Sequence, residues 1–359
     1  MYSAPVFLRR YNNGMATTQK FLDVYSGVSK LPSGHARDVI VPGCMVLEGG
    51  AWRGIYTQGA LDFYMQNDIN MAATIGVSAG AMSGLSYVSG QIGRSARINL
   101  SYRHDPNYYG VPAVLQNHGI TGFQFVFENV NREDPLDKAA FNDLRRRFIA
   151  PATNNETGEA EYFENGKCSD IFQGIRASAT VPFLSEPVEI DGKKYLDGGI
   201  ACKIPVEWAL QEGYEKIIVI KTQDSSYRKT SNMPEGLIRS FYHRYPRLME
   251  DMLREMESYN ALCDRIDALA EEGRIFVLAP SKPIRIDRFE KNMERLGELY
   301  WRGYHDASAS FTKLQEYLNE YSGHPRASVP DLQGHLSGVS RPGKNYQSIP
   351  APKSCVPEL

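Results

Sequence analysis

The sequence predicts an α/β fold with a mostly parallel central sheet, followed by a mainly helical C-terminal region. Three features of the 359-residue chain support this prediction. Between residues 44 and 89, short apolar runs alternate with glycine turns and amphipathic segments, as in parallel strands joined by helices. An Asp-Gly turn lies between extended residues at 188–196, which is typical of a hairpin. Residues 237–272 form a long, charged stretch with helical periodicity.

The first elements follow a simple alternation. Residues 1–37 lack periodicity, and we expect them to form a loose extension. Strands are expected at residues 44–47 and 73–77, and each is followed by glycine or small residues and then by a helix, at residues 54–65 and 79–89. This order predicts crossover connections within one sheet.

The middle of the chain completes the predicted α/β domain, which we place at residues 38–225. A helix is expected at residues 137–148. The hairpin at 188–196 is followed by the end of a helix at 207–213 and by a short apolar strand at 216–221.

A mainly helical region is expected at residues 226–321. Its long charged stretch has a break or kink at Pro246, because proline cannot continue the helical hydrogen-bond ladder. One more strand is expected at residues 274–278, and a further helix at residues 289–321. Residues 322–359 are rich in Pro, Gly and Ser with few apolar anchors, which predicts a disordered tail.

The composition excludes several classes of protein. Lys and Arg total 40 against 42 Asp and Glu, so the formal net charge is −2 and nothing favours nucleic acid as a partner. No run approaches the roughly 18 apolar residues of a spanning helix, and the N-terminus lacks the apolar core of a secretory signal. The five cysteines form no Cys-x-x-Cys pair, which favours reduced thiols and a cytoplasmic protein.

The strongest local signal is Gly76-Val-Ser78-Ala-Gly80, between an apolar strand and a helix of small residues. A serine on such a tight turn exposes its Oγ, while the flanking glycines let the backbone close without Cβ clashes. The following helix N-terminus adds positive potential where an oxyanion develops. The pattern therefore predicts a nucleophilic serine at position 78, although an ordinary βα turn is the alternative.

A glycine-rich loop precedes the first helix and runs from Gly49 and Gly50 through Ala51 to Arg53 and Gly54. Consecutive glycines leave backbone N–H groups open to an anion or an oxyanion. No Lys-Ser/Thr pair follows, which argues against a nucleotide P-loop. Ala51 stands where a Gly-x-Gly-x-x-Gly dinucleotide loop needs its second glycine, which argues against that site as well.

A third element, Asp197-Gly198-Gly199, closes the predicted hairpin. The strand would bring the Asp197 carboxylate to its end, and a partly desolvated carboxylate can act as the base that a serine nucleophile needs. Ordinary turn chemistry is the alternative interpretation of these three residues.

The order of these motifs resembles that of the patatin-like phospholipases, whose pattern is Gly-Gly-Gly-x-Arg-Gly, Gly-x-Ser-x-Gly and Asp-Gly-Gly/Ala. Residues 177–182 are similar to the Ala-Ser-x-Ala-x-Pro segment of that family, with Thr180 in place of the second alanine. The resemblance covers about residues 39–222 and implies a three-layer α/β/α fold. The helical region after it resembles the C-terminal part of one bacterial branch of the family.

The resemblance implies a role for each matching residue. Ser78 would be the nucleophile and Asp197 its only basic partner. The N–H groups of Gly49, Gly50 and Ala51 would form the oxyanion hole, with Arg53 nearby; Ala51 replaces the third glycine of the family. The substrate would be a lipid acyl ester, with transient contact to a membrane surface at the inner face, and no metal or cofactor is expected.

Two other functions fit parts of the pattern. A Ser-Asp-His hydrolase shares the serine turn but needs a histidine after the acid. The histidines that follow Asp197 are His243, His305, His324 and His335. A lipid-binding or regulatory protein that kept the fold without activity is the non-enzymatic alternative.

Two apolar features allow more than one interpretation. A tyrosine-rich patch could line a lipid entrance or belong to the edge of the core; it comprises Tyr102, Tyr108 and Tyr109. The long helical stretch could lie on a membrane, cap the site or pack as a partly solvated helix, which we favour. Its apolar residues include Met249, Met252, Leu253 and Met256.

Overall fold

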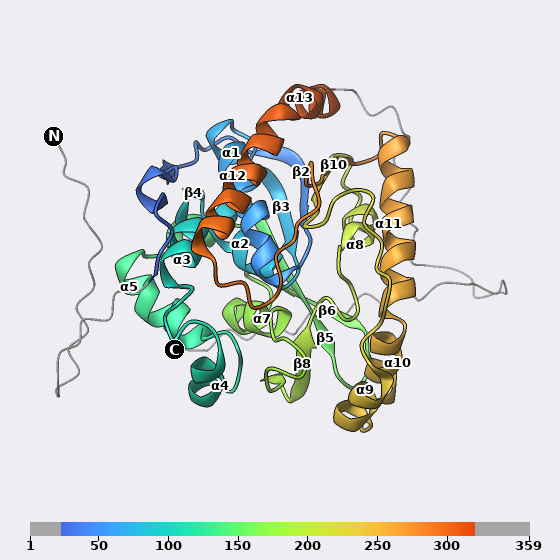
Figure 1. Cartoon of the computed structure of the whole chain (residues 1–359). Coiled ribbons are helices and arrows are strands. Elements are labelled where there is room, and N and C mark those ends of the chain that lie inside the picture. The colour runs from blue at the N-terminus through green and yellow to red at the C-terminus, as the bar shows by residue number, and fades with distance from the viewer. Residues whose placement is uncertain (1–22, 320–359) are drawn as a thin grey trace, which may run out of the picture.

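The computed structural model describes residues 23–319, and an eight-stranded mixed sheet forms its centre (Figure 1). The strands follow the order β10-β9-β2-β3-β5-β8-β7, and β6 pairs with β5. Neighbours from β10 to β5 are parallel, whereas β6, β7 and β8 run antiparallel to their partners. The strands are β2 (Val41–Leu47), β3 (Met71–Gly76), β5 (Arg147–Asn154), β6 (Ala160–Glu164), β7 (Val188–Ile190), β8 (Lys193–Asp197), β9 (Ile217–Ile220) and β10 (Phe276–Leu278). The predicted mostly parallel α/β fold is confirmed.

Helices cover both faces of this sheet because its central strands are apolar on both sides. In β2, Met45 and Leu47 belong to the core beneath α1 (Gly54–Gln66) and α2 (Ala79–Val88). The neighbouring Cys44 and Val46 point to the opposite face, toward α8 (Val206–Gln211) and α11 (Glu255–Glu271). Two apolar cores therefore enclose the sheet.

The C-terminal helix α12 (Met293–Ala309) packs along α1 at very short range. A Cβ at Gly59 would lie 2.0 Å from the carbonyl oxygen of Tyr300, and one at Gly303 would lie 1.9 Å from that of Tyr56. Only glycine allows the two backbones to approach this closely. A third apolar cluster joins α9 (Glu235–Tyr242) and α10 (Pro246–Leu253) to Leu196 of β8.

Shorter elements complete the described part of the chain. They are η1 (Val28–Lys30), β1 (Gly34–His35), η2 (Ala51–Arg53), β4 (Gln91–Ile92), α3 (Arg94–Tyr102), α4 (Val111–Asn117), η3 (Phe125–Val130), α5 (Asn131–Glu133), α6 (Lys138–Phe141), α7 (Ile171–Ser178) and α13 (Phe311–Asn319). Within residues 23–319, no helix combines the length and apolar character needed to cross a bilayer.

Most of the predicted elements are confirmed, but the helix expected at residues 137–148 is wrong. Asp137 does cap a helix, since its side chain accepts a hydrogen bond from the N–H of Ala140, but α6 ends at Phe141. Strand β5 begins at Arg147 and pairs with β3, β6 and β8. Its apolar run is buried on both faces, so it lacks the alternation that distinguishes a strand from a helix.

The loose extension expected at residues 1–37 is wrong for residues 23–37. The Tyr25 ring packs on the core, and its hydroxyl accepts a hydrogen bond from Trp301 Nε1 at 3.1 Å. Strand β1 pairs with β4. These contacts join distant parts of the chain, so no local periodicity predicts them. The tail predicted at residues 322–359 lies outside the described residues, as do residues 1–22.

Candidate active site

Ser78 occupies the tight turn between β3 and α2. Its backbone lies at φ 56° and ψ −120°, a conformation that L-residues rarely adopt and that is typical of strained functional sites. A Cβ at Gly76 would lie 2.5 Å from the backbone of Gly80, and one at Gly80 would lie 2.6 Å from the carbonyl oxygen of Leu47. Both glycines are therefore required for the turn to close.

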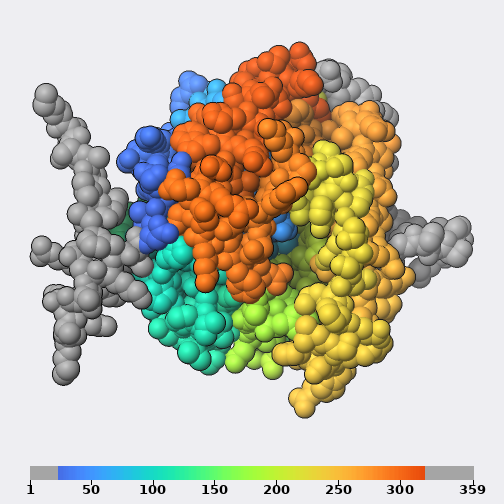
Figure 2. Space-filling view, viewed as in Figure 1, coloured from blue at the N-terminus to red at the C-terminus, as the bar shows by residue number. Residues whose placement is uncertain are grey.

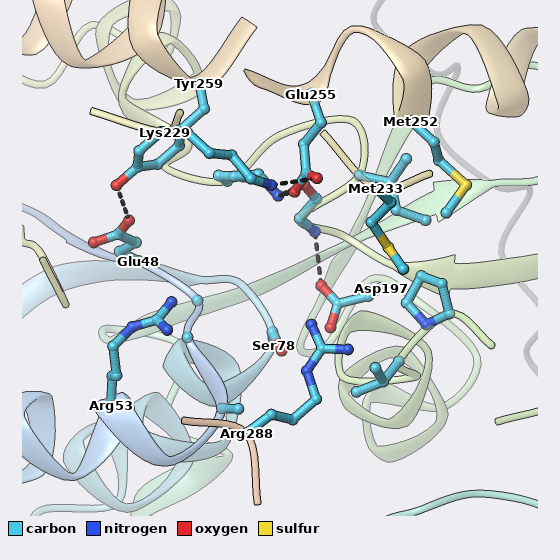
Figure 3. Close-up of a pocket in the computed structure, with 18 of the residues that line it drawn as sticks. Glu48, Arg53, Ser78, Asp197, Lys229, Met233, Met252, Glu255, Tyr259 and Arg288 are labelled. Carbon is cyan, nitrogen blue, oxygen red and sulfur yellow. Dashed lines mark hydrogen bonds and ion pairs between the residues drawn. The ribbon is translucent and has the colours of Figure 1, made fainter. Parts of the chain in front are cut away.

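Asp197 ends β8 and faces Ser78 across the same cavity (Figure 3). Burial raises the pKa of its carboxyl, while the Ser78 hydroxyl and the Gly199 N–H, which donates to it at 2.8 Å, oppose that rise. A Cβ at Gly198 would lie 2.1 Å from the carbonyl oxygen of Pro151. The first of the two glycines thus lets the chain turn closely against β5.

The segment at residues 177–182 connects the two motifs through hydrogen bonds. The buried hydroxyl of Ser178 accepts the N–H of Ser78 at 3.0 Å, and its carbonyl accepts the N–H of Gly198 at 3.1 Å. The carbonyl of Thr180 accepts the N–H of Asp197 at 2.9 Å. This segment therefore fixes the serine turn and the aspartate turn relative to each other.

The glycine-rich loop forms another edge of the cavity. A Cβ at Gly49 would lie 3.2 Å from Ser78 Cβ, and one at Gly50 would lie 2.6 Å from Thr222 Oγ1. Among residues 23–319, the N–H groups of Gly49, Gly50 and Ala51 donate to no protein acceptor. These donors are thus free to receive an anionic oxygen beside Ser78.

The end of the loop joins it to the serine turn. A Cβ at Gly54 would lie 2.8 Å from Ala79 Cβ, so glycine lets α1 begin against α2. Ala51 adopts φ 48°, the left-handed region that a glycine would take with less strain. The replacement of the family's third glycine therefore leaves the loop conformation possible, with strain at one residue.

Carboxylates and cations from several elements line the cavity around Ser78, which has a volume of about 330 Å³ (Figure 3). Glu48 is only 3% exposed and accepts hydrogen bonds from the Thr222 N–H and, at 2.8 Å, from the Tyr259 hydroxyl. Glu255 forms ion pairs with both Lys203 and Lys229. Burial opposes its ionisation, but the two lysines hold the pKa of Glu255 below its usual range.

A family model described as patatin-like phospholipase matches residues 45–210, which span the glycine-rich loop, the serine turn and the aspartate turn. Residues 45–210 are a patatin-like phospholipase domain. The resemblance drawn from the motifs is thereby confirmed. A second model, described as a domain of unknown function (DUF6363), matches residues 245–319.

Several known proteins resemble the chain. The uncharacterised protein YjjU of Escherichia coli is 27% identical over 265 residues, 72% of this chain and 74% of YjjU. The probable lipid hydrolase 463L of invertebrate iridescent virus 6 is 24% identical over 252 residues, 60% of this chain and 84% of that protein. The crystal structure of VipD from Legionella pneumophila aligns with a TM-score of 0.43 and 13% identity, covering 84% of this chain and 72% of VipD.

A second, largely apolar cavity lies on the other side of Ser78 in the patatin-like domain. It shares Ser78, Ala51 and Val181 with the cavity described above, which we call the charged cavity because Glu48, Glu255 and several cations line it. Tyr108 and Tyr109 both line it. Two residues of the tyrosine-rich patch thus border a cavity beside the serine, whereas Tyr102 packs against the core.

The helices after the patatin-like domain contribute to the charged cavity, so the stretch at residues 237–272 caps it as well as packing. Ile238, Met252, Glu255 and Tyr259 all line the cavity. In Figure 2 a hollow lies between the orange loop before α12 and the yellow segment before α9. Sequence reasoning identified Met252 as a candidate but missed Glu255, Tyr259 and Arg288, because none of these three belongs to a spaced motif.

No histidine of the described residues lines either cavity beside Ser78. His243 lies near the carbonyl of Ser240 on the surface, and the ring of His305 stacks on Trp301. His324 and His335 lie outside the described residues. Among residues 23–319, the ionisable side chain that ends a strand beside Ser78 in the charged cavity is therefore the Asp197 carboxylate, and the histidines lie elsewhere.

Proposed function

We propose that this protein hydrolyses acyl esters of lipids, with Ser78 as the nucleophile and Asp197 as the general base. One observation carries the proposal. Ser78, Asp197 and the unpaired N–H groups of the glycine-rich loop border a single cavity. A nucleophile, a base and oxyanion donors are the three parts that acyl transfer requires.

In the first half of the reaction, Ser78 Oγ attacks the ester carbonyl carbon while its proton passes to the Asp197 carboxylate. The N–H groups of Gly49, Gly50 and Ala51 stabilise the oxyanion of the tetrahedral intermediate. The intermediate collapses with cleavage of the ester C–O bond, and the leaving alkoxide takes the proton from Asp197. The products of this half are a free alcohol and an acyl ester on Ser78.

In the second half, water attacks the acyl carbonyl and gives its proton to Asp197. Collapse of the second tetrahedral intermediate releases the carboxylic acid and returns the proton to Ser78 Oγ. The sum is one ester and one water converted into one acid and one alcohol. The raised pKa of Asp197 favours this exchange, because a base works best with a pKa near the working pH.

The two cavities beside Ser78 suit the two parts of a lipid ester. The apolar one has walls of Met82, Leu85, Ile98 and Phe123 and fits the acyl chain. The charged cavity fits the alcohol part. With a lipid ester bound in this way, its ester bond would lie at Ser78, which lines both cavities.

Two exposed aromatic side chains support transient contact with a lipid surface. Phe241 is 56% exposed, and its ring packs 5.3 Å from Phe183, which lines the charged cavity. Phe289 is 52% exposed and directly follows Arg288, which lines the same cavity. Aromatic rings at a cavity mouth can enter the interfacial region of a bilayer.

Hydrolysis assays on two variants test the proposal. With p-nitrophenyl and phospholipid esters, Ser78→Ala and Asp197→Asn should each lose on the order of 10⁴-fold in kcat. Ser83→Ala and Asp62→Asn are the matched controls, since these buried residues lie outside both cavities, and each should retain activity within about threefold.

Near-normal hydrolysis by Asp197→Asn would exclude the proposed base. Hydrolysis that needs a histidine would favour the triad. A wild-type protein that binds lipid but hydrolyses none of these esters would favour the non-catalytic alternative.

A further inference from the structure

Two arginines that line the charged cavity take no part in the ion pairs around them. Glu255 is shared by Lys203 and Lys229, and Glu48 is satisfied by hydrogen bonds. Within residues 23–319, the Arg288 guanidinium forms no hydrogen bond or ion pair. Arg53 Nε is buried and equally without a partner. Two guanidinium groups therefore border the cavity with their donors free.

Arg288 belongs to the loop between β10 and α12, outside the patatin-like domain. Figure 3 shows its guanidinium pointing toward Asp197 and Ser78, and its charge acts on the Asp197 carboxyl. It forms no ion pair with Asp197, so the carboxylate remains available as a base. The Arg288 guanidinium lies in the charged cavity, where the alcohol part of a bound ester would lie.

The backbone of this loop is anchored by hydrogen bonds to the patatin-like domain. Four consecutive carbonyls accept hydrogen bonds from side chains of the patatin-like domain. The carbonyl of Arg288 accepts from the Tyr109 hydroxyl at 2.9 Å, and that of Lys291 accepts from the His104 ring at 2.8 Å. The carbonyls of Phe289 and Glu290 accept from the Arg103 guanidinium at 3.1 and 2.8 Å. Such bonds fix the direction in which the Arg288 side chain leaves the loop.

The same anchoring side chains also contact the glycine-rich loop and line the apolar cavity. The Arg103 guanidinium lies 4.7 Å from the ring centroid of Trp52 and 4.8 Å from that of Tyr109. Trp52 directly follows Ala51, and Tyr109 lines the apolar cavity. One cluster therefore sets the position of Arg288 relative to the oxyanion donors and the acyl site.

We propose that Arg288 binds a phosphate on the alcohol part of the substrate, so that the enzyme prefers acyl esters of phosphate-bearing alcohols to neutral ones. The inference rests on the proposed hydrolase function. Arginine suits this task because its planar fork donates two parallel hydrogen bonds to phosphate oxygens. Arg53 adds positive charge on the side of the glycine-rich loop.

A pair of substrates that differ only in the phosphate tests this proposal. They are octanoyl glycerol and octanoyl glycerol 3-phosphate, used below their micelle-forming concentrations. The wild type should show a kcat/KM at least about tenfold higher for the phosphate ester. Arg288→Ala should reduce that preference about 10- to 100-fold, mainly through a higher KM for the phosphate ester.

Two control variants separate binding from other effects. Arg285→Ala removes an arginine of the same loop that lies outside the charged cavity, and it should keep the wild-type preference. Arg288→Lys keeps the positive charge but loses the planar guanidinium with its two parallel donors, and it should retain part of the preference for the phosphate ester. An octanoyl ester of glycerophosphoglycerol tells whether a phosphate diester is preferred as well as the monoester.

Three results would overturn the proposal. Equal wild-type rates on the neutral and phosphate esters would reject the phosphate preference while leaving the hydrolase function intact. An equal loss on both esters in Arg288→Ala, with a shifted pH profile, would make Arg288 a positioning residue for Asp197. Absence of wild-type hydrolysis of either ester would reject the proposed function itself, and the inference with it.

Discussion

The patatin-like domain and the C-terminal region reach the same cavity by different means. In residues 45–210, the site is built from backbone: Ser78 has a positive φ, and Gly76, Gly80 and Gly198 leave no room for a Cβ. In the C-terminal helical region, residues 226–319, the contribution comes from long side chains: Tyr259 donates a hydrogen bond to Glu48, and Arg288 lines the cavity.

This difference suggests a division of tasks: the patatin-like domain would carry out the reaction, and the C-terminal region would help to recognise the substrate. Backbone strain and close approach tolerate almost no substitution, so the proposed chemistry depends on a few rigid turns. Long side chains on helices and an anchored loop can change without disturbing those turns, and they can adapt the cavity to one class of substrate. The two regions are joined mainly along α1 and α12.

One added methyl group in each region should have opposite effects, and this is the largest difference expected between them. Gly80→Ala should destabilise the fold by about 1–3 kcal/mol and lower kcat at least about 100-fold, because its Cβ would strike the Leu47 carbonyl. Gly236→Ala in α9 has open space around it and should stabilise the helix by about 0.5–1 kcal/mol. Urea unfolding and hydrolysis rates measure both effects.

Equal responses to the two substitutions would contradict the contrast between the regions. A fully active Gly80→Ala protein would show that the serine turn has more freedom than its packing indicates.

The contact between α1 and α12 joins the two regions, and it should make the stability of the fold depend on pH. Asp62 of α1 accepts hydrogen bonds from Gly93 N–H at 2.8 Å and from the Tyr300 hydroxyl of α12 at 2.7 Å. Burial raises its pKa to about 7, so the folded state binds its proton more tightly than the unfolded state does. Its contribution to stability is therefore complete below about pH 4 and is lost as the pH rises toward about 7, at up to about 1.4 kcal/mol per pH unit.

Asp62→Asn tests this assignment, because the amide cannot ionise. The variant should unfold at higher urea concentration than the wild type at pH 8, by more than about 1 kcal/mol, and the difference should vanish near pH 4. A difference that stays constant between pH 4 and pH 8 would show that Asp62 does not titrate in this range.

The smallest expected effect concerns Ala51. Ala51→Gly relieves about 1 kcal/mol of left-handed strain but increases the entropy of the unfolded chain, so stability should change by less than about 1 kcal/mol. Activity should stay within about threefold, because the backbone already adopts the conformation that glycine would take. Ala51→Val is the matched control and should lose stability, since β-branched residues avoid positive φ.

A rise of about 100-fold or more in the rate of Ala51→Gly would contradict this expectation. It would mean that alanine turns an oxyanion donor away from the substrate.

The contrast between the regions also explains what the sequence could predict. Ser78, Asp197 and the glycine-rich loop were recognisable because tight turns require glycine at fixed, short spacing. Ser178 lay in a recognised segment, but its hydrogen bond to Ser78 spans 100 residues. Arg288 and Tyr259 belong to no spaced pattern, and only the packing of α11 and of the loop before α12 brings them to the site.

Strand β5 shows the other limit of the sequence. Its residues are buried on both faces between β3 and β8, so helical and strand periodicities cannot be told apart there. Besides the nearby β6, its partners are β3 and β8, whose paired residues lie about 40 to 75 residues away along the chain.

Covalent labelling tests the central claim most directly. The folded wild-type protein is incubated with a fluorophosphonate probe, and its intact mass and labelled peptide are measured. We expect one adduct, on Ser78, with slower labelling in Asp197→Asn and none in Ser78→Ala. An unlabelled wild-type protein, or an adduct that persists in Ser78→Ala, would contradict the assignment of Ser78 as the nucleophile.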